Sequence, residues 1–425
     1  MNLLGQKSSN IVSFPLDIPN VRVLRVQQNK QGDYIITIES TQVGATCQHC
    51  GRHITQLHSR GRWVTVRHLP VFGHRVYLRF QPKRYACPDC EDRTTTQELD
   101  WYPQRSPHTD AYDEHLMRQL INSTITDVSR KEDVGYEAVV GAIGRRLNTT
   151  VQWTDFTELR VIGIDEIALT KGRRDYVALI TTQQANGRVR ILAVLPDRKK
   201  ETVRAFLETI PSDLRATMAT VCTDMWRGYV NAVEEFADAH ADVTVEVTID
   251  RYHVAENYRR CVDQVRIRER RRLKKSLSPS EYEEIVKGTM WIVRKNHADL
   301  DAEERERLRQ LFAYAPELKR AYTFREELTA IFELPLTPTE AKRRLRAWAA
   351  KVRRSALTCF DTFLTTLGNW LDKIANYFTD RLSSGFVEGL NNKVKTLKRR
   401  CYGILRVTTL FQRLYLDLEG YQRFA

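Results

Sequence analysis

The chain has 425 residues, which is too long for one ordinary hydrophobic core and predicts two to four domains. Lys and Arg together number 67 against 53 Asp and Glu, so the formal charge of +14 and the pI of about 9.4 favour a polyanionic partner. No run of about 18 or more apolar residues occurs, which excludes a membrane-spanning helix, although the charge alone would also suit a generically basic soluble protein.

Residues 1–20 have no basic segment followed by an apolar one, so we expect no signal peptide and a reducing, cytoplasmic location. Of eight cysteines, four form two CxxC pairs, Cys47/Cys50 and Cys87/Cys90. The remaining four are isolated and are expected to be small apolar fillers: Cys222, Cys261, Cys359 and Cys401.

The two CxxC pairs predict a zinc site in a domain of residues 1–104. Each pair places two thiolates on one tight turn, and two turns complete a tetrahedral four-cysteine site that leaves no open position, so the zinc would be structural. Strand-like residues 62–67 and 76–80, joined at Gly73, predict a β-hairpin between the pairs. A zinc ribbon with an unusually long spacer results; a redox CxxC is the alternative. The module is rich in arginine, which suits phosphate contact.

Residues 105–155 are expected to form a small helical domain. Helical spacing covers residues 112–121, 125–131 and 137–147, with a turn at 133–136, which is the helix-turn-helix plan. Its last helix would enter the major groove, and Arg145 and Arg146 at its end would hold phosphates. Many other small helical bundles share this pattern.

A strand-rich segment begins at Val161 and predicts the first part of an α/β core, residues 156–260. Strands are expected at 161–165, 176–182, 189–195, 219–224 and 243–250, with helices at 202–210 and 227–237. Asp165 ends the first strand and Asp224 the fourth. This order, with an acid at each of those two ends, is the ribonuclease-H-like plan.

Residues 261–380 read as an all-helical insertion that interrupts this core. The segment is charged and poor in glycine, and Pro335 and Pro338 separate two helical halves. Basic runs at 266–275 and 342–348 are either solvated faces or DNA contacts. Three tryptophans are expected in the core, with stacking on a flipped base as the alternative for one of them: Trp291, Trp348 and Trp370.

The final part of the core, residues 381–425, is expected to carry a third acid, Glu388, on a helix. Apolar residues recur at helical spacing and would pack on the sheet: Val387, Leu390, Val394, Leu397 and Cys401. A polar face would offer one carboxylate to a metal and further groups to DNA phosphates: Glu388, Asn391, Asn392, Lys395 and Arg399. An ordinary solvated helix is the alternative.

Two strand-end aspartates and a late glutamate can hold two divalent metals, which stabilise the attacking and leaving oxygens of a phosphoryl displacement. Glu166 is the rival of Asp165, but adjacent residues of a strand point to opposite faces. Asp250 and His253 share a face at the start of a helix, so His253 would contact the scissile phosphate or orient a metal ligand. Alternatively, Asp250 only caps that helix and His253 is packed.

Several stretches resemble the DDE transposases of bacterial insertion sequences, and specifically the ISL3 family. They are residues 163–166, 223–226, 250–254 and 388–395, which include Asp-Arg-Tyr-His and Glu-Gly-Leu-Asn-Asn-Lys. The order of zinc ribbon and helix-turn-helix is similar as well, so the resemblance covers nearly the whole chain. It implies that Asp165, Asp224 and Glu388 bind two Mg²⁺ or Mn²⁺ ions, and it brings His253 near the chemistry.

The resemblance implies an enzyme that binds the terminal inverted repeats of its element, cleaves the DNA and transfers the strand to target DNA. Two ends must meet, so we expect a homodimer or larger assembly on double-stranded DNA, in the bacterial cytoplasm with the nucleoid. Two alternatives remain at this point: a non-catalytic, zinc-containing DNA-binding regulator, and another ribonuclease-H-like DNA nuclease.

Overall fold

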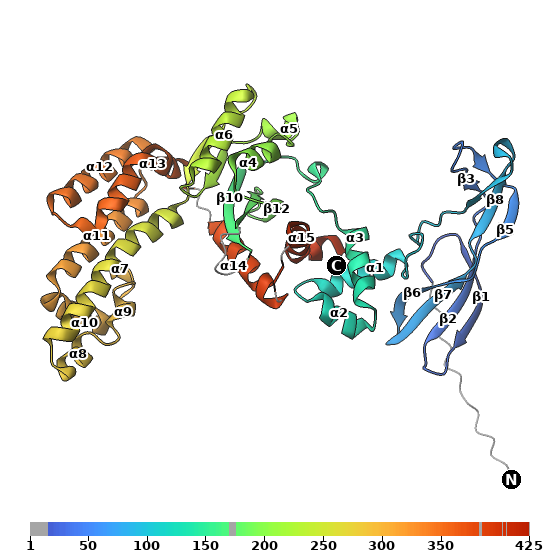
Figure 1. Cartoon of the computed structure of the whole chain (residues 1–425), viewed down its shortest axis with the longest axis horizontal. Coiled ribbons are helices and arrows are strands. Elements are labelled where there is room, and N and C mark those ends of the chain that lie inside the picture. Colours follow the sequence, from blue (N-terminus) through green and yellow to red (C-terminus); the bar gives the residue numbers. More distant parts are fainter. Residues whose placement is uncertain (1–15, 170–175, 382–384, 402, 405, 425) are drawn as a thin grey trace, which may run out of the picture. The chain divides into compact units, whose positions relative to one another are not determined.

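The computed structural model of the chain is a mixed α+β protein and describes residues 16–169, 176–381, 385–401, 403–404 and 406–424 (Figure 1). Residues 1–15 lie outside this set, so most of the N-terminal segment for which no signal peptide was predicted is not described. The chain forms two units. The first unit comprises Met1–Leu147 with Glu419–Ala425, and the second comprises Asn148–Leu418.

The N-terminal part of the first unit is built from strands in three small sheets. The strands are β1 (Val21–Gln28), β2 (Tyr34–Ser40), β3 (Ala45–Thr46), β4 (His53–Ile54), β5 (Leu57–Arg60), β6 (Val64–Val71), β7 (His74–Phe80), β8 (Lys83–Cys87) and β9 (Arg93–Thr96). The sheet orders are β1-β2-β7-β6, β3-β4 and β5-β8-β9. The predicted hairpin is β6 with β7, which pair antiparallel around Gly73 at a φ of +80°. Glycine suits this turn because a positive φ strains other residues.

Three helices follow in the first unit, as the sequence predicts: α1 (Asp110–Leu120), α2 (Ile125–Glu132) and α3 (Tyr136–Arg146). Thr109 and Thr124 begin the first two, each accepting a hydrogen bond from a backbone N–H in the first turn. Asp133 ends α2 in the left-handed conformation with a φ of +50°. Apolar residues at helical spacing, such as Leu116, Val128 and Val139, are fully buried between the helices.

A five-stranded sheet forms the centre of the second unit. Its strands are β10 (Val161–Ala168), β11 (Tyr176–Gln183), β12 (Val189–Leu195), β13 (Thr220–Thr223) and β14 (Glu246–Ile249), each within one of the predicted strand segments or extending it at one end. The order is β12-β11-β10-β13-β14. The first three pair antiparallel, whereas β10, β13 and β14 run parallel to one another. Three carboxyl ends therefore meet at one edge.

Helices cover both faces of this sheet (Figure 1). One face packs on α4 (Lys200–Leu207), α5 (Ser212–Arg215) and α6 (Arg227–Ala239) through residues such as Ile162 and Ile164. The other face packs on α14 (Gly385–Arg400) and α15 (Val407–Phe424). Leu390, Val394 and Leu397 of the predicted apolar stripe are at most 4% exposed, so the stripe is confirmed for the side chains that the structure describes.

Between β14 and α14 the second unit is helical. The helices are α7 (Arg251–Ser276), α8 (Pro279–Ile285), α9 (Thr289–Ile292), α10 (Ala302–Tyr314), α11 (Pro316–Glu333), α12 (Pro338–Arg354) and α13 (Asp361–Asp380). Short 3₁₀ turns lie at His297–Asp299 and Thr358–Phe360 in this segment, at Trp153–Asp155 before β10, and at Pro88–Cys90 in the first unit. The predicted break at Pro335 and Pro338 is the α11–α12 connection, where Thr337 and Glu340 form a capping box.

The tryptophan prediction is correct in part. Trp348 is buried and donates its indole N–H to the Phe324 carbonyl at 3.0 Å, and Trp370 packs partly buried against the core. Trp291 is 67% exposed, so the expectation of a core position for it is wrong. It lies on the four-residue helix α9, which is too short to have a fully covered face. Among the described helices, none has the length and apolar character needed to cross a bilayer.

Candidate active site

Acidic side chains gather at the carboxyl side of the three parallel strands. The register pairs Ile164 with Thr223 and Thr223 with Ile249, and the residue after each of these is an aspartate: Asp165, Asp224 and Asp250. Asp224 and Asp250 directly follow their strands, but the prediction that Asp165 ends its strand is wrong, because β10 continues to Ala168. The backbone N–H of Asp250 donates to the Thr223 carbonyl at 2.9 Å, so the hydrogen bonding between β13 and β14 extends to Asp250. Parallel neighbours in register share a face, so the sheet brings the first two predicted acids together.

Asp165 is 6% exposed and is held on both carboxylate oxygens. The Glu166 backbone N–H donates to Oδ1 at 2.6 Å, and the Asn391 side-chain amide on α14 donates to Oδ2. Burial raises the pKa of Asp165, and these two hydrogen bonds offset part of the shift. Glu166, the predicted rival, instead forms an ion pair with Arg198 at 2.7 Å.

Asp224 is the more perturbed carboxyl group. Its pKa is raised to about 6, mainly by burial; the nearby His253 lowers the pKa, and the charges of Glu166 and Asp165 raise it. Its Oδ1 is buried and has no hydrogen-bond partner among the described residues. A buried carboxylate oxygen without a partner costs free energy unless something else binds it.

His253 lies beside Asp165 and Asp250. Its Nε2 is 4.0 Å from Asp165 Oδ1 and 3.9 Å from Asp250 Oδ2, and its side chain is 27% exposed. Asp250 caps α7, because its side chain accepts from the Tyr252 backbone N–H at 2.9 Å. The capping alternative therefore holds for Asp250, while His253 reaches the acidic edge and keeps access to solvent.

Helix α14 supplies the remaining predicted groups. Glu388 belongs to this helix, but its side chain lies outside the described residues. Asn391, predicted as a DNA contact, turns to Asp165, and its Oδ1 is buried without a partner among the described residues. Asn392, Lys395 and Arg399 are exposed, so their contact with DNA stays a prediction.

Two further polar groups at this edge were missed by sequence reasoning. The Thr223 hydroxyl and the Tyr229 hydroxyl are buried and have no partner among the described residues. Burial, together with the charges of Asp224 and Glu166, raises the pKa of Tyr229, so its phenol stays protonated. No local pattern marks either residue, because each occupies an ordinary strand or helix position.

The four predicted zinc ligands come together in the first unit. The sulfurs of Cys47, Cys50, Cys87 and Cys90 lie within 4.8 Å of one another, with 4.0 Å between Cys47 and Cys90 and 3.7 Å between Cys50 and Cys87. A tetrahedral site with Zn–S bonds of about 2.3 Å requires about 3.8 Å between sulfurs. The set therefore fits zinc in a closed, structural site.

The thiol pKa values also indicate a metal site. Backbone N–H groups of Cys50 and His49 lower the pKa of Cys47 to about 6, whereas the neighbouring Cys50 raises the pKa of Cys90 to about 12. Four crowded thiols cannot all ionise unless a cation joins them. His49 contributes its backbone N–H to Cys47 Sγ at 3.4 Å, which is a supporting contact.

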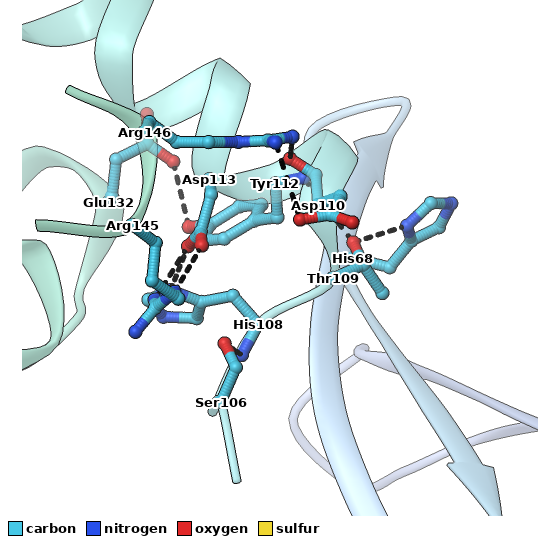
Figure 2. A network of polar contacts seen from close by, with 10 residues as sticks. All are labelled: His68, Ser106, His108, Thr109, Asp110, Tyr112, Asp113, Glu132, Arg145 and Arg146. Atoms are coloured by element: carbon cyan, nitrogen blue, oxygen red, sulfur yellow. Dashed lines mark hydrogen bonds and ion pairs between the residues drawn. The ribbon is translucent and has the colours of Figure 1, made fainter. Parts of the chain in front are cut away.

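Arg145 and Arg146 take part in a polar network of the first unit (Figure 2). Arg145 Nε donates to Asp113 at 2.7 Å, and Arg146 donates to Glu114 at 2.9 Å and also reaches Asp110. Asp113 is fully buried and is also 2.9 Å from His108 Nδ1. Both guanidiniums are thus engaged inside this unit, and their contact with DNA stays a prediction.

Comparison with known proteins assigns both parts of the chain. Residues 162–414 match the family model of ISL3 DDE transposases, and residues 44–90 match a model described as the zinc-finger of transposase IS204/IS1001/IS1096/IS1165. The chain is 28% identical over 378 residues to the transposase for insertion sequence element IS1001 of Bordetella parapertussis, covering 89% of each chain. It is 24% identical over 402 residues to the transposase for insertion sequence element IS1557 of Mycobacterium tuberculosis, covering 88% of this chain and 86% of that one.

The first model spans the sheet, the helical segment and α14, and the second spans the four cysteines. More than half of the sequence is covered by the first model alone. This chain therefore belongs to the ISL3 family of DDE transposases.

Proposed function

We propose that this chain binds the terminal inverted repeats of an insertion sequence, cleaves the DNA with two divalent metal ions and joins the exposed 3′ ends to target DNA. One observation carries the proposal. Asp165 on β10 and Asp224 directly after β13 lie on adjacent parallel strands, and buried oxygens of Asp224 and Asn391 beside them lack partners among the described residues. Such an edge suits a hard cation and a phosphate, because both would satisfy groups that the chain leaves unpaired.

The proposed fold of the catalytic part is ribonuclease-H-like. Supporting this, three antiparallel strands are followed by two parallel ones, with helices on both faces. In this reading residues 156–260 and 381–425 form the core, residues 261–380 are an insertion, and residues 1–104 and 105–155 are the zinc ribbon and the helix-turn-helix.

Asp165, Asp224 and Glu388 are the proposed ligands of two Mg²⁺ or Mn²⁺ ions. Bound there, the ions would activate the attacking oxygen and stabilise the leaving 3′-oxygen. Asn391 holds the Asp165 carboxylate in one orientation, and Asp224 is held by its strand end. His253 is proposed to donate a proton or a hydrogen bond to the scissile phosphate, because its ring lies beside Asp165 and keeps solvent access.

Recognition of the DNA ends is assigned to the first unit. The zinc ribbon is rich in exposed arginines, and α1–α3 would present a helix to the major groove. Asn392, Lys395 and Arg399 on the exposed face of α14 are proposed to contact phosphates near the cut. Synapsis of two ends would use a homodimer or larger assembly, acting in the bacterial nucleoid.

The test is cleavage of labelled DNA that carries the terminal repeats of this element, with added Mg²⁺ or Mn²⁺ and with no divalent metal. Omission is preferable to a chelator, since a chelator would also remove zinc from the cysteine cluster. Asp165→Asn, Asp224→Asn and Glu388→Ala should each abolish nicking at the repeat boundary and leave repeat binding intact. Asp213→Asn, which changes an exposed acid on α5, is the matched control.

Equal loss of binding and cleavage in these variants would contradict the assigned roles. Tight binding by the wild type without cleavage in any metal would favour the second candidate, a non-catalytic DNA-binding regulator. Cleavage that ignores the repeat sequence would favour a different ribonuclease-H-like nuclease.

A further inference from the structure

A charged groove starts next to the acidic edge and runs along α7. Its volume is about 360 Å³, and its walls include Tyr252, Arg259, Arg260 and Asp263 on α7, with Arg294 and Arg325 opposite. The α7 members recur at helical spacing and therefore form one stripe. From Tyr252 to Asp263 this stripe is about 16 Å long, at about 1.5 Å per residue, which is the length of a few nucleotides.

One end of the groove touches the proposed active site. Tyr252 and His253 are adjacent, and their rings meet edge to face with 5.6 Å between centroids. His253 in turn lies 4.0 Å from Asp165. A DNA strand whose phosphate sits at the acidic edge would therefore enter the groove within a nucleotide of the cut.

The groove favours an anion. Its four arginines outnumber its two carboxylates, Glu256 and Asp263. Arg260 is paired with Glu256 at 3.2 Å, Arg294 with Asp263 at 2.7 Å, and the buried Arg325 with Glu326 at 2.6 Å. The described part of the chain offers no carboxylate to Arg259. Arg259 is also exposed, so it is a cation available for a phosphate.

Two exposed aromatic rings lie at the groove: Tyr252 lines it, and Trp291 lies outside the lining but beside Arg294, which is part of it. Trp291 is 67% exposed and Tyr252 is 41% exposed. The Arg294 guanidinium lies 5.6 Å from the centre of the Trp291 ring. Exposed aromatics interleaved with arginines are the platform on which unpaired bases stack, because every base has a flat face and every nucleotide a phosphate.

We propose that this groove holds the nucleotides next to the scissile phosphate as a single strand, with Arg259 on a backbone phosphate and Trp291 stacked on an unpaired base. The inference rests on the proposed function, since it takes the acidic edge as the place of cleavage. It adds a substrate site on the helical segment, and it assigns a role to Trp291, which lies outside the hydrophobic core.

The test uses the full chain and terminal-repeat DNA in which the fluorescent base 2-aminopurine replaces, in turn, each nucleotide nearest the cut. Binding is followed without divalent metal, so that the DNA stays intact. With the wild type, stacking should quench the fluorescence at one position. Trp291→Ala should abolish the quenching, and Arg259→Gln should weaken binding of this DNA about tenfold and reduce its salt dependence by about one phosphate contact.

Matched controls come from the same helical segment. Arg305→Gln changes an exposed arginine of α10, and Tyr314→Ala removes an aromatic that is 43% exposed on the same helix. Both should behave as the wild type. All four variants change exposed side chains, and equal thermal unfolding temperatures will verify that each is folded.

The outcomes separate the two proposals. If the wild type cleaves but Trp291→Ala and Arg259→Gln match the controls, the groove is not a nucleotide site and the transposase mechanism stands. If the wild type never cleaves but the quenching still depends on Trp291, the catalytic proposal fails and the groove remains a single-strand site. Absence of both cleavage and quenching overturns both.

Discussion

Asp165 and Asn391 are 226 positions apart in the chain, yet an amide hydrogen of one is bonded to a carboxylate oxygen of the other. This contact fixes the carboxylate and leaves the Asn391 carbonyl oxygen buried and unpaired among the described residues. The amide therefore acts as a positioning group that also offers an oxygen to the site. Such supporting contacts tune metal affinity nearly as strongly as the ligands themselves.

Replacing Asn391 with Ala should lower metal-dependent cleavage and the affinity for Mn²⁺ by about 10- to 100-fold, since Asp165 loses its orienting hydrogen bond. Binding of terminal-repeat DNA should be unchanged. The matched control is Asn369→Ala, which changes an exposed asparagine on α13. A titration of cleavage against Mn²⁺ concentration measures the effect. Equal defects in the two variants, or weaker DNA binding in Asn391→Ala alone, would contradict the positioning role.

The raised pKa of Asp224, at about 6, makes a prediction about metal-free stability. The unfolded pKa is near 3.8, so folding favours the protonated form. The resulting penalty is absent below about pH 4, grows between about pH 4 and pH 6, and is complete above that range. At pH 7.5 without divalent metal, Asp224→Asn should therefore be more stable than the wild type, by about 3 kcal/mol.

Thermal or urea unfolding at pH 7.5 and near pH 4 measures this difference, which should vanish at the lower pH. Added Mg²⁺ should stabilise the wild type and not Asp224→Asn. Asp213→Asn serves as the exposed control. If Asp224→Asn is less stable than the wild type at pH 7.5, burial of the ionised Asp224 does not destabilise the folded protein.

Individual residues were predictable only where the backbone decides the outcome. The positions of Asp165 and Asp224 were predictable because the apolar run before each one predicts a strand, although β10 continues past Asp165 to Ala168. The partners of Asn391, Arg145 and Arg146 depend on which elements pack together, and one sequence does not reveal this packing. Trp291 was placed wrongly for the same reason, since its short helix leaves the ring uncovered.

At the scale of elements, periodicity identified the helices α1–α3, the hairpin β6–β7 and all five strands of the central sheet. It did not identify β1 and β2, because β1 is largely exposed and its alternation gives little signal. Strand ends were less accurate: β14 begins at Glu246, three residues after the predicted start. Strand order and direction came only with the structure.

The cysteine cluster joins elements that are each too short to be stable alone, so metal should hold this part of the first unit together. Cys47→Ser should release the zinc, measured as metal content of the purified protein, and should weaken repeat binding. Cys359→Ser, which changes an isolated cysteine of the second unit, should keep the full zinc content. Unchanged zinc in Cys47→Ser would remove the ribbon assignment.

The polar network around Asp113 should stabilise the helices of the first unit. Burial raises the pKa of this carboxyl, but hydrogen bonds from His108 and Arg145 outweigh it, and the pKa is lowered. Its stabilisation is therefore present above the unfolded pKa and lost as the pH falls through the folded one. Asp113→Ala leaves His108 and Arg145 without their partner and should cost about 3 kcal/mol.

Urea unfolding measured at neutral pH tests this cost. The control is Glu114→Gln, which removes a partner of Arg146 that is 49% exposed and should change stability by less than about 1 kcal/mol. Similar small effects in both variants would show that the network positions the helices without stabilising them.

For the whole molecule, the charge of +14 predicts how DNA binding responds to salt. A protein that neutralises several phosphates releases counterions, so the affinity for terminal-repeat DNA should fall about 10³-fold or more between about 50 and 200 mM salt. Fluorescence anisotropy at a series of salt concentrations measures the slope. A nearly flat dependence would mean that the excess charge does not face DNA.

The long helical segment between β14 and α14 also sets an order in time. A ribosome synthesises the four cysteines, Asp165, Asp224 and all of α7–α13 before it reaches Asn391. A nascent or prematurely terminated chain can thus carry its zinc-binding part while it lacks the group that orients Asp165. Synthesis itself delays assembly of the proposed active site until nearly the whole chain has been made.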